Sequence, residues 1–333
     1  MKISDKQRSI SRNISYNKLF LVIKFLLAIR YNLKLILQLL LFPYLLVKRD
    51  FYWYKADKSR LPGKIFFFYG KALGIKLFNK MNFSPKLLLN PVSIVRYFEY
   101  DFALRNFTDN KLSNNVVLDI SSPYLFGFYL SNTFEGTYEY RNPDSNDLFN
   151  VKKYSSKFKF MMKYSADSAD ATKLSFPDSS FSHIISISVI EHINGNGDSE
   201  AIKEMWRVLR PNGILILTFP VAKTFEEEFS DKDTYGLKIE QVKEKFFFQR
   251  LYDETSIKNR LLDKITDFTI LSKEIFGESE SGFYQSYSER WKKNGLSETV
   301  KDPYYISKYF KKLDFFDQIK HSAVIGITLR KDK

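Results

Sequence analysis

Residues 170–220 read DATKLSFPDSSFSHIISISVIEHINGNGDSEAIKEMWRVLRPNGILILTFP, and this stretch predicts the fold. Residues 181–189 and 214–219 are continuous apolar, β-rich runs, which are typical of strands buried on both faces of a parallel sheet. Between them, apolar residues at helical spacing predict a helix over 199–209 that ends at Pro211-Asn212-Gly213. A strand–helix–strand unit of this kind indicates a parallel sheet covered by helices.

The same alternation extends outward in both directions. We expect helices over 91–109 and 125–132, and strands over 116–120, 136–141, 161–165 and 323–330. The fold class is therefore α/β. We predict a doubly wound, mostly parallel seven-stranded sheet with helices on both faces. Residues 277–320 form an insertion before the last strand, and about 40 residues is far longer than an ordinary loop.

The basic charge of the chain is concentrated near its N-terminus. The 333 residues contain 52 Lys and Arg against 38 Asp and Glu, a formal net charge of +14. Residues 1–90 hold 18 basic and 3 acidic side chains, which leaves 34 basic and 35 acidic in residues 91–333. We therefore divide the chain into a basic, amphipathic helical arm, 1–90, and a near-neutral domain, 91–333.

Two absences in the composition limit the chemistry. The sequence has no cysteine, which excludes disulfides, Cys-ligated metals and a cysteine nucleophile. It has three histidines, so a multi-histidine metal site is not expected and we predict no metal.

Residues 19–47 are long and apolar enough to span a bilayer, but lysine and arginine interrupt them. Lys24, Arg30 and Lys34 fall within about one third of the helix circumference, which is typical of a helix lying in a membrane interface. Such a helix can equally pack on its own domain. A transmembrane span and nucleic-acid binding by the basic and aromatic residues that follow are weaker alternatives. We expect a cytoplasmic protein, peripheral at the inner membrane face if the arm binds anionic lipid.

The residues from Asp170 to Pro220 resemble the class I S-adenosylmethionine-dependent methyltransferases, within them the small-molecule type that includes quinone and sterol methyltransferases. The resemblance rests on an acid-Ala pair, the run LSFPDSSF, a strand, Glu191-His192, a helix ending RVLRPNG, and a further strand. It implies a Rossmann-like transferase with S-adenosylmethionine as the cofactor, lying across the carboxyl ends of the strands.

Two loops implied to bind the cofactor depart from the family pattern. The loop after the first strand reads Asp119-Ile120-Ser121-Ser122-Pro123, where the family has glycines that let the backbone approach the methionine part. The resemblance assigns Asp119, Ser121 and Ser122 to this loop. The family also ends its second strand with an acid that accepts both ribose hydroxyls. Glu139 is the only acid inside that strand here, and pairing with Arg141 is the alternative for it.

The remaining implied site residues follow the third and fourth strands. Asp170 and Ala171 take the place where the family contacts adenine, and Ser188 takes the place where backbone faces the amino acid part of the cofactor. His192 is the imidazole nearest the transferred methyl group in this pattern. It is either a base or a structural residue, and methyl transfer needs a base only for a hydroxyl, carbon-acid or protonated-amine acceptor.

The resemblance leads to a specific expectation and its alternatives. We expect an enzyme that methylates a small or lipid-like acceptor, with residues 221–249 and 277–320 shaping the acceptor site. The alternative is a methyltransferase-fold protein that has lost catalysis and serves as a binding or scaffolding module. A nucleic-acid methyltransferase is disfavoured because residues 91–333 are near neutral and no Asn/Asp-Pro-Pro-Tyr/Phe motif follows the fourth strand.

Overall fold

The computed structural model describes residues 40–109, 115–233, 241–242 and 244–333. The chain divides into two units, Met1–Asp50 and Phe51–Lys333. Residues 40–55 are helical, and the part of the amphipathic stretch before residue 40 lies outside the described residues. In the described ranges, no helix combines the length and apolar character needed to cross a membrane.

An eight-stranded sheet forms the centre of the second unit, in the order β10-β9-β11-β5-β4-β1-β2-β3. Its strands are β1 (Val116–Ile120), β2 (Thr137–Arg141), β3 (Lys163–Asp167), β4 (Phe181–Ile187), β5 (Leu209–Val221), β9 (Phe268–Glu278), β10 (Phe310–Leu313) and β11 (Ala323–Lys331). Strands β3, β2, β1, β4 and β5 are parallel, and β11 lies antiparallel between β5 and β9. This confirms the predicted doubly wound, mostly parallel sheet.

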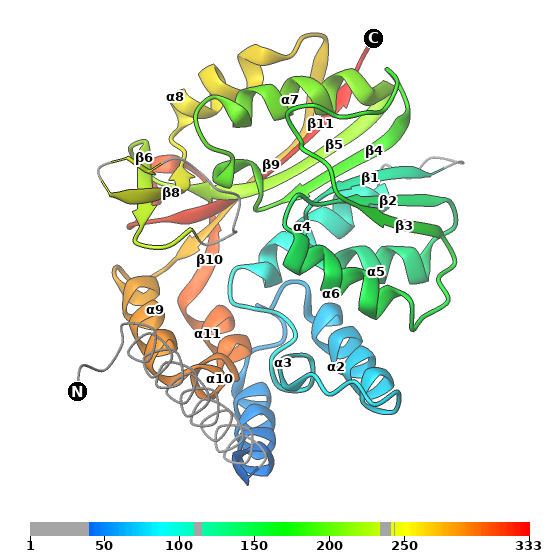
Figure 1. Ribbon diagram of the computed structural model, residues 1–333. Coiled ribbons are helices and arrows are strands. Elements are labelled where there is room, and N and C mark those ends of the chain that lie inside the picture. The colour runs from blue at the N-terminus through cyan, green and yellow to red at the C-terminus, as the bar shows by residue number, and fades with distance from the viewer. Residues whose placement is uncertain (1–39, 110–114, 234–240, 243) are drawn as a thin grey trace, which may run out of the picture. The chain divides into compact units, whose positions relative to one another are not determined.

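Helices cover both faces of this sheet, as predicted (Figure 1). On one face lie α4 (Arg96–Asp109), α5 (Tyr124–Thr133) and α6 (Ser145–Ser155), and on the other lies α7 (Gly197–Val208). Successive side chains of a strand point to opposite faces of the sheet, so Val117 belongs to one apolar cluster and Leu118 to the other. Both clusters are continuous across the sheet.

The segment after residue 50 belongs to the core of the second unit. Helix α2 (Lys64–Phe78) buries Phe66, Phe67, Leu73 and Leu77 in the same cluster as Val117. The short helix α3 (Pro85–Leu89) follows, with Ser84 as its N-cap. The two compact units therefore divide after Asp50, whereas the charge distribution divides the chain after residue 90. The net charge of residues 51–90 does not predict that α2 is part of the core, because its lysines are interspersed with the large apolar residues that are buried.

The insertion before the last strand is mostly helical and adds one strand to the sheet. It contains α9 (Phe283–Asn294), α10 (Leu296–Thr299) and α11 (Asp302–Tyr309). Strand β10 then pairs antiparallel with β9, so the sheet has eight strands and not seven. With only four residues and no alternation of buried and exposed positions, β10 leaves little pattern in the sequence.

A smaller antiparallel sheet, β6-β8-β7, occupies the segment that follows β5. Its strands are β6 (Glu226–Ser230), β7 (Gln241–Val242) and β8 (Lys245–Leu251).

Candidate active site

The predicted cofactor residues gather around the carboxyl ends of the parallel strands. The chain leaves β1 toward β2 and β3 on one side and returns to β4 and β5 on the other, so the strand order reverses between β1 and β4. Crevices at such a reversal are where ligands bind in open α/β sheets. Asp119 lies in β1, Ser121 and Ser122 directly follow it, and Ser188 directly follows β4.

The loop between β1 and α5 has the backbone of a glycine loop without a glycine. Ser121 has φ +54°, in the left-handed region that residues other than glycine adopt rarely. Its backbone N–H and its hydroxyl both donate to the Arg141 carbonyl at the end of β2, at 2.8 and 3.0 Å. Ser122 is buried, and its hydroxyl accepts from the Ile187 N–H of β4 at 3.1 Å. The loop is thus fastened to β2 and β4 at once.

Asp119 of β1 holds this loop through a hydrogen bond to its backbone. Its carboxylate is fully buried and accepts from the Ser122 N–H at 2.9 Å through one oxygen and from the Tyr138 hydroxyl through the other. Burial raises the pKa of Asp119 to about 6, although both hydrogen bonds act to lower it. Because both oxygens have partners inside the chain, Asp119 shapes the loop and does not itself present a carboxylate to a ligand.

The second strand presents no unpaired carboxylate at its end. Glu139 forms an ion pair with Arg141 at 2.6 Å and accepts a hydrogen bond from Ser165, which matches the alternative given for it above. The first residue beyond β2 is Asn142, which is buried. Its side-chain amide donates to the Tyr140 hydroxyl at 2.8 Å and to Asp147 at 2.7 Å, while its carbonyl oxygen accepts from the Asp144 N–H at 2.9 Å. At the end of β2, where the resemblance implies an acid for the ribose, this chain has an amide whose hydrogen bonds go to its neighbours.

Asp170 and Ala171 lie in the loop between β3 and β4. One carboxylate oxygen of the exposed Asp170 accepts from the N–H and the hydroxyl of Thr172, at 2.9 and 2.8 Å. The described residues provide no partner for its other oxygen, which remains available to an amine donor. Ala171 is buried beside it. This arrangement suits an adenine contact by a side-chain acceptor.

A polar cluster at the end of β4 includes residues that sequence reasoning missed. Ser188 has φ +50°, and its hydroxyl donates to Glu99 of α4. The fully buried Glu99 also accepts from Thr218 of β5 at 3.0 Å and pairs with Arg96. Glu99 lies on a helix that precedes the family motifs by about 70 residues, so spacing along the chain gave no signal for it.

Glu191 and His192 follow in a short helical turn, Ile190–His192. Burial raises the pKa of Glu191 to about 8, so its carboxyl is protonated at neutral pH. One of its oxygens, Oε2, is buried and has no hydrogen-bond partner among the described residues. His192 Nδ1 donates to the Phe248 carbonyl of β8 at 2.7 Å, since a carbonyl can only accept. Burial lowers the pKa of His192 to about 4, so the ring is neutral at pH 7 with its other nitrogen unprotonated.

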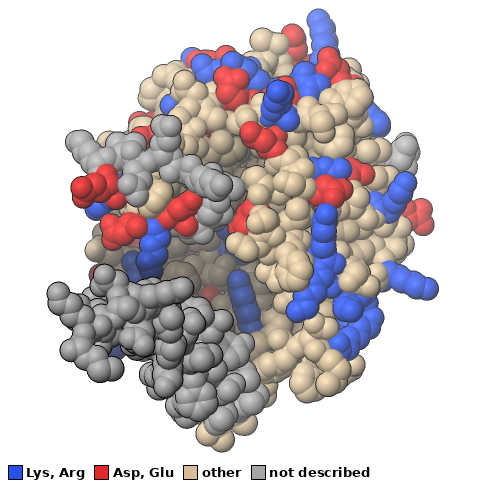
Figure 2. All heavy atoms as spheres, viewed as in Figure 1, with Lys and Arg blue, Asp and Glu red and all other residues tan. Residues whose placement is uncertain are grey.

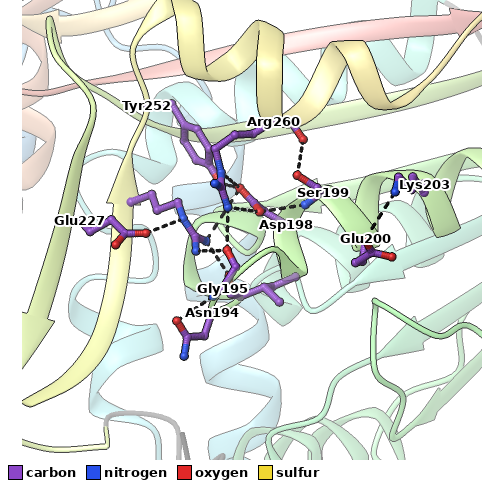
Figure 3. A network of polar contacts seen from close by, with 11 residues as sticks. Asn194, Gly195, Asp198, Ser199, Glu200, Lys203, Glu227, Tyr252 and Arg260 are labelled. Atoms are coloured by element: carbon purple, nitrogen blue, oxygen red, sulfur yellow. Dashed lines mark hydrogen bonds and ion pairs between the residues drawn. The ribbon is translucent and has the colours of Figure 1, made fainter. Parts of the chain in front are cut away.

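A second network fixes the loop that follows His192 (Figure 3). The fully buried Arg250 of β8 donates to the carbonyls of Ile193 and Gly195, both at 2.6 Å, and to Glu227 at 3.1 Å. Asp198, at the start of α7, accepts from Arg260 at 2.7 and 2.8 Å and from Tyr252 at 2.9 Å. The small sheet and the segment after it therefore clamp the 193–198 loop beside the candidate site.

The comparisons with known proteins agree with this geometry. Residues 144–217 match the family model described as a methyltransferase domain. No curated protein matches the chain significantly. Similar solved structures include the MccD protein, at 16% identity and a TM-score of 0.45, covering 72% of this chain and 99% of that one.

Two further similar structures are those of S-adenosylmethionine-dependent methyltransferases. A SAM-dependent methyltransferase from Methanosarcina mazei has 14% identity, a TM-score of 0.42, and coverage of 68% of this chain and 96% of its own. An S-adenosylmethionine-dependent methyltransferase from Clostridium acetobutylicum has 14% identity, a TM-score of 0.41, and coverage of 69% and 89%. The family match over residues 144–217 and the Rossmann-like strand order support the resemblance to the class I methyltransferases, which use S-adenosylmethionine as cofactor.

Proposed function

We propose that this chain transfers a methyl group from S-adenosylmethionine to a small or lipid-like acceptor. The observation that carries the proposal is the β1–α5 loop, in which Ser121 keeps the left-handed backbone of a glycine. The backbone can then pass close to a ligand although the sequence lacks the glycines.

The site residues suit the methionine part and the adenine of the cofactor, whereas the residues at the ribose are already paired with each other. The first turn of α5 suits the carboxylate of the methionine part, because the N–H groups of Tyr124 and Leu125 have no partner within the helix. Ser121 and Ser122, whose N–H groups donate to Arg141 and Asp119, hold the loop that precedes this turn. Asp170 and Ala171 suit adenine. At the ribose, Glu139 is engaged by Arg141, so the hydroxyls would share that carboxylate or meet the Asn142 amide.

The chain's contribution to the reaction is positioning. The cofactor supplies a methyl group already activated on a sulfonium, so the protein must hold the acceptor in line with it and exclude water. Because His192 is neutral, its unprotonated Nε2, which lies 3.6 Å from Oε1 of Glu191, can accept a hydrogen bond from a hydroxyl or amine acceptor. A pKa of about 4 makes it a weak base, which favours positioning over proton abstraction.

The insertion supports a small or lipid-like acceptor. Tyr284 of α9 is largely desolvated near Arg96 and Glu99, and burial raises its pKa. Its neighbours Tyr287 and Tyr305 are buried within the insertion itself, where Tyr287 donates to Asp302 at 2.9 Å. Tyr287 and Tyr305 therefore belong to the packing of the insertion, and of these three rings Tyr284 is the one that could contact a partly apolar acceptor.

Calorimetry with S-adenosylmethionine tests the cofactor part of the proposal. We expect the full chain to bind it, and we expect Asp170→Ala to bind more weakly. Asp178→Ala serves as the matched control because Asp178 is an exposed loop aspartate that pairs with Arg207 at 2.7 Å, between the same two strands. Absence of binding at millimolar cofactor would contradict the proposal and favour a binding or scaffolding module, which the Asn142 amide at the ribose position also favours.

Mass spectrometry tests the acceptor part. Cell extracts incubated with the protein and methyl-labelled cofactor should yield a labelled small molecule or lipid. Label found in nucleic acid would contradict the proposed acceptor class while leaving the cofactor assignment intact.

A further inference from the structure

The exposed face of α2 carries a stripe of large apolar side chains. Ile65, Phe68, Ala72 and Ile75 recur at steps of three and four residues and are exposed, with Phe68 53% and Ile75 52% accessible. Beyond the end of α2, Met81 is 95% accessible. The opposite face of the same helix is buried through Phe66 and Phe67. A helix that is apolar on its outer face as well as its inner face has a surface that water does not favour.

Lysines border this stripe, and acidic residues are absent from the segment around it. Residues 58–98 contain eight Lys and Arg and no Asp or Glu. Lys64 and Lys76 are exposed, and none of the ion pairs of the described residues includes either of them. In Figure 2, basic side chains gather around the region where Figure 1 places α2.

A basic cavity opens beside the stripe. It measures about 580 Å³, and four lysines line it: Lys76 and Lys80 from α2 and the turn after it, and Lys157 and Lys159 from the segment after α6. The aromatic rings of Tyr69, Phe158 and Phe160 form its apolar walls. The cavity suits phosphate groups attached to an apolar body.

We propose that α2 and the segment around it form a docking face for an anionic lipid bilayer. Apolar side chains enter the interface between headgroups and acyl chains, and the bordering lysines attract the anionic headgroups. The N-terminal segment of the chain is the other candidate to cover the stripe. It holds ten basic and two acidic residues over 1–50, so its charge repels the lysines around α2, whereas an anionic bilayer attracts both.

Co-sedimentation of the full chain with vesicles tests the proposal, and it needs neither cofactor nor activity. We expect binding to phosphatidylcholine vesicles containing about one third phosphatidylglycerol, weaker binding at high salt, and little binding to phosphatidylcholine alone. Lys64→Glu/Lys76→Glu should lower the partition coefficient at least about tenfold, because each lysine near a lipid surface contributes about fivefold. Phe68→Glu/Ile75→Glu should lower it by a similar factor through the lost apolar contacts.

Two matched controls separate this face from general surface effects. Lys292→Glu/Lys293→Glu changes the net charge equally at the exposed end of α9, and Ile270→Glu/Phe315→Glu changes two exposed apolar side chains elsewhere. Both controls should bind vesicles within about twofold of the wild type, and all variants should unfold at similar temperatures. Wild-type binding by both α2 variants, no binding by the wild type, or equal binding to neutral vesicles would each overturn the proposal.

Discussion

Ser121 is the residue on which the cofactor loop depends most directly. At φ +54°, a β-branched side chain would add strain on the order of 1–3 kcal/mol, whereas glycine would add none. We expect Ser121→Val to weaken S-adenosylmethionine binding at least about tenfold in calorimetry and Ser121→Gly to bind nearly as the wild type does. Ser179 has the same φ of +54° before β4, away from the site, so Ser179→Val should lose stability but keep cofactor affinity. Wild-type affinity in Ser121→Val would contradict the role given to this loop.

Glu191 and His192 give the free energy of unfolding opposite dependences on pH. The folded state holds a proton on Glu191 up to about pH 8, while the unfolded chain releases it near 4.5, so stability falls as pH rises through this range. The pKa of His192 is lowered to about 4, so stability rises with pH until the unfolded histidine has lost its proton near 6.5. Above pH 6.5, His192 no longer changes the free energy of unfolding, and the decrease caused by Glu191 remains.

Urea unfolding at pH 6.5 and 8.5 measures this fall. We expect the wild type to lose roughly 2 kcal/mol between the two values, since one uncompensated proton changes stability by about 1.4 kcal/mol per pH unit. Glu191→Gln, which is neutral throughout, should lose much less, and His192→Gln should lose as much as the wild type. Equal losses in the wild type and Glu191→Gln would show that Glu191 is ionised in the folded protein at neutral pH.

At the scale of the element, α5 packs closely against β2 because Gly127 has no side chain. A Cβ on Gly127 would lie 2.7 Å from the hydroxyl of Tyr138, which donates to Asp119. Gly127→Ala should therefore destabilise the protein by about 1–3 kcal/mol in urea unfolding, although alanine favours a helix by about 1 kcal/mol. Asn132→Ala, at an exposed position of the same helix, should be neutral or slightly stabilising. A stabilised Gly127→Ala would mean that Tyr138 moves freely and does not fix Asp119.

Strand β8 acts on the site through Arg250. Arg250→Met removes the donor to the Ile193 carbonyl, one of the two donors to the Gly195 carbonyl, and the ion pair with Glu227. We therefore expect a loss of about 3 kcal/mol or more and weaker methyl transfer. Arg330→Met removes a half-exposed ion pair with Asp332 and should cost less than about 1 kcal/mol. Equal losses in the two variants would contradict the clamping role of β8.

At the scale of the whole molecule, the sequence predicts what local pattern encodes. Strand β1 matches the predicted 116–120, and α7 and β4 differ from their predictions by about two residues, because these elements combine strong apolar periodicity with clear end signals. Strand β10 and the two-residue β7 were not predicted, since so short a strand is defined by its partner and not by its own residues.

Some residues of the candidate site could be predicted from local sequence, and others could not. Ser121, Ser122, Asp170 and Ser188 lie at strand ends, where the family pattern implied them. Glu99 and Arg250 reach the site from α4 and β8, which are distant in the sequence, and only tertiary packing brings them there. Asn142, which directly follows β2, carries no sequence signal of its own because the family pattern implies an acid there.

The boundary between the two units leads to a test on truncated chains. Residues 51–333 contain both apolar clusters, including Phe66 and Phe67 of α2, which are 0% and 1% accessible. We therefore expect a chain starting at Phe51 to unfold cooperatively within a few degrees of the full chain. A chain starting at Pro91 lacks α2, leaves the partners of Phe66 and Leu77 open to water, and should fail to unfold cooperatively in the same thermal scan. Cooperative unfolding of 91–333 at the full-chain temperature would place the domain boundary at residue 90, as charge alone suggested.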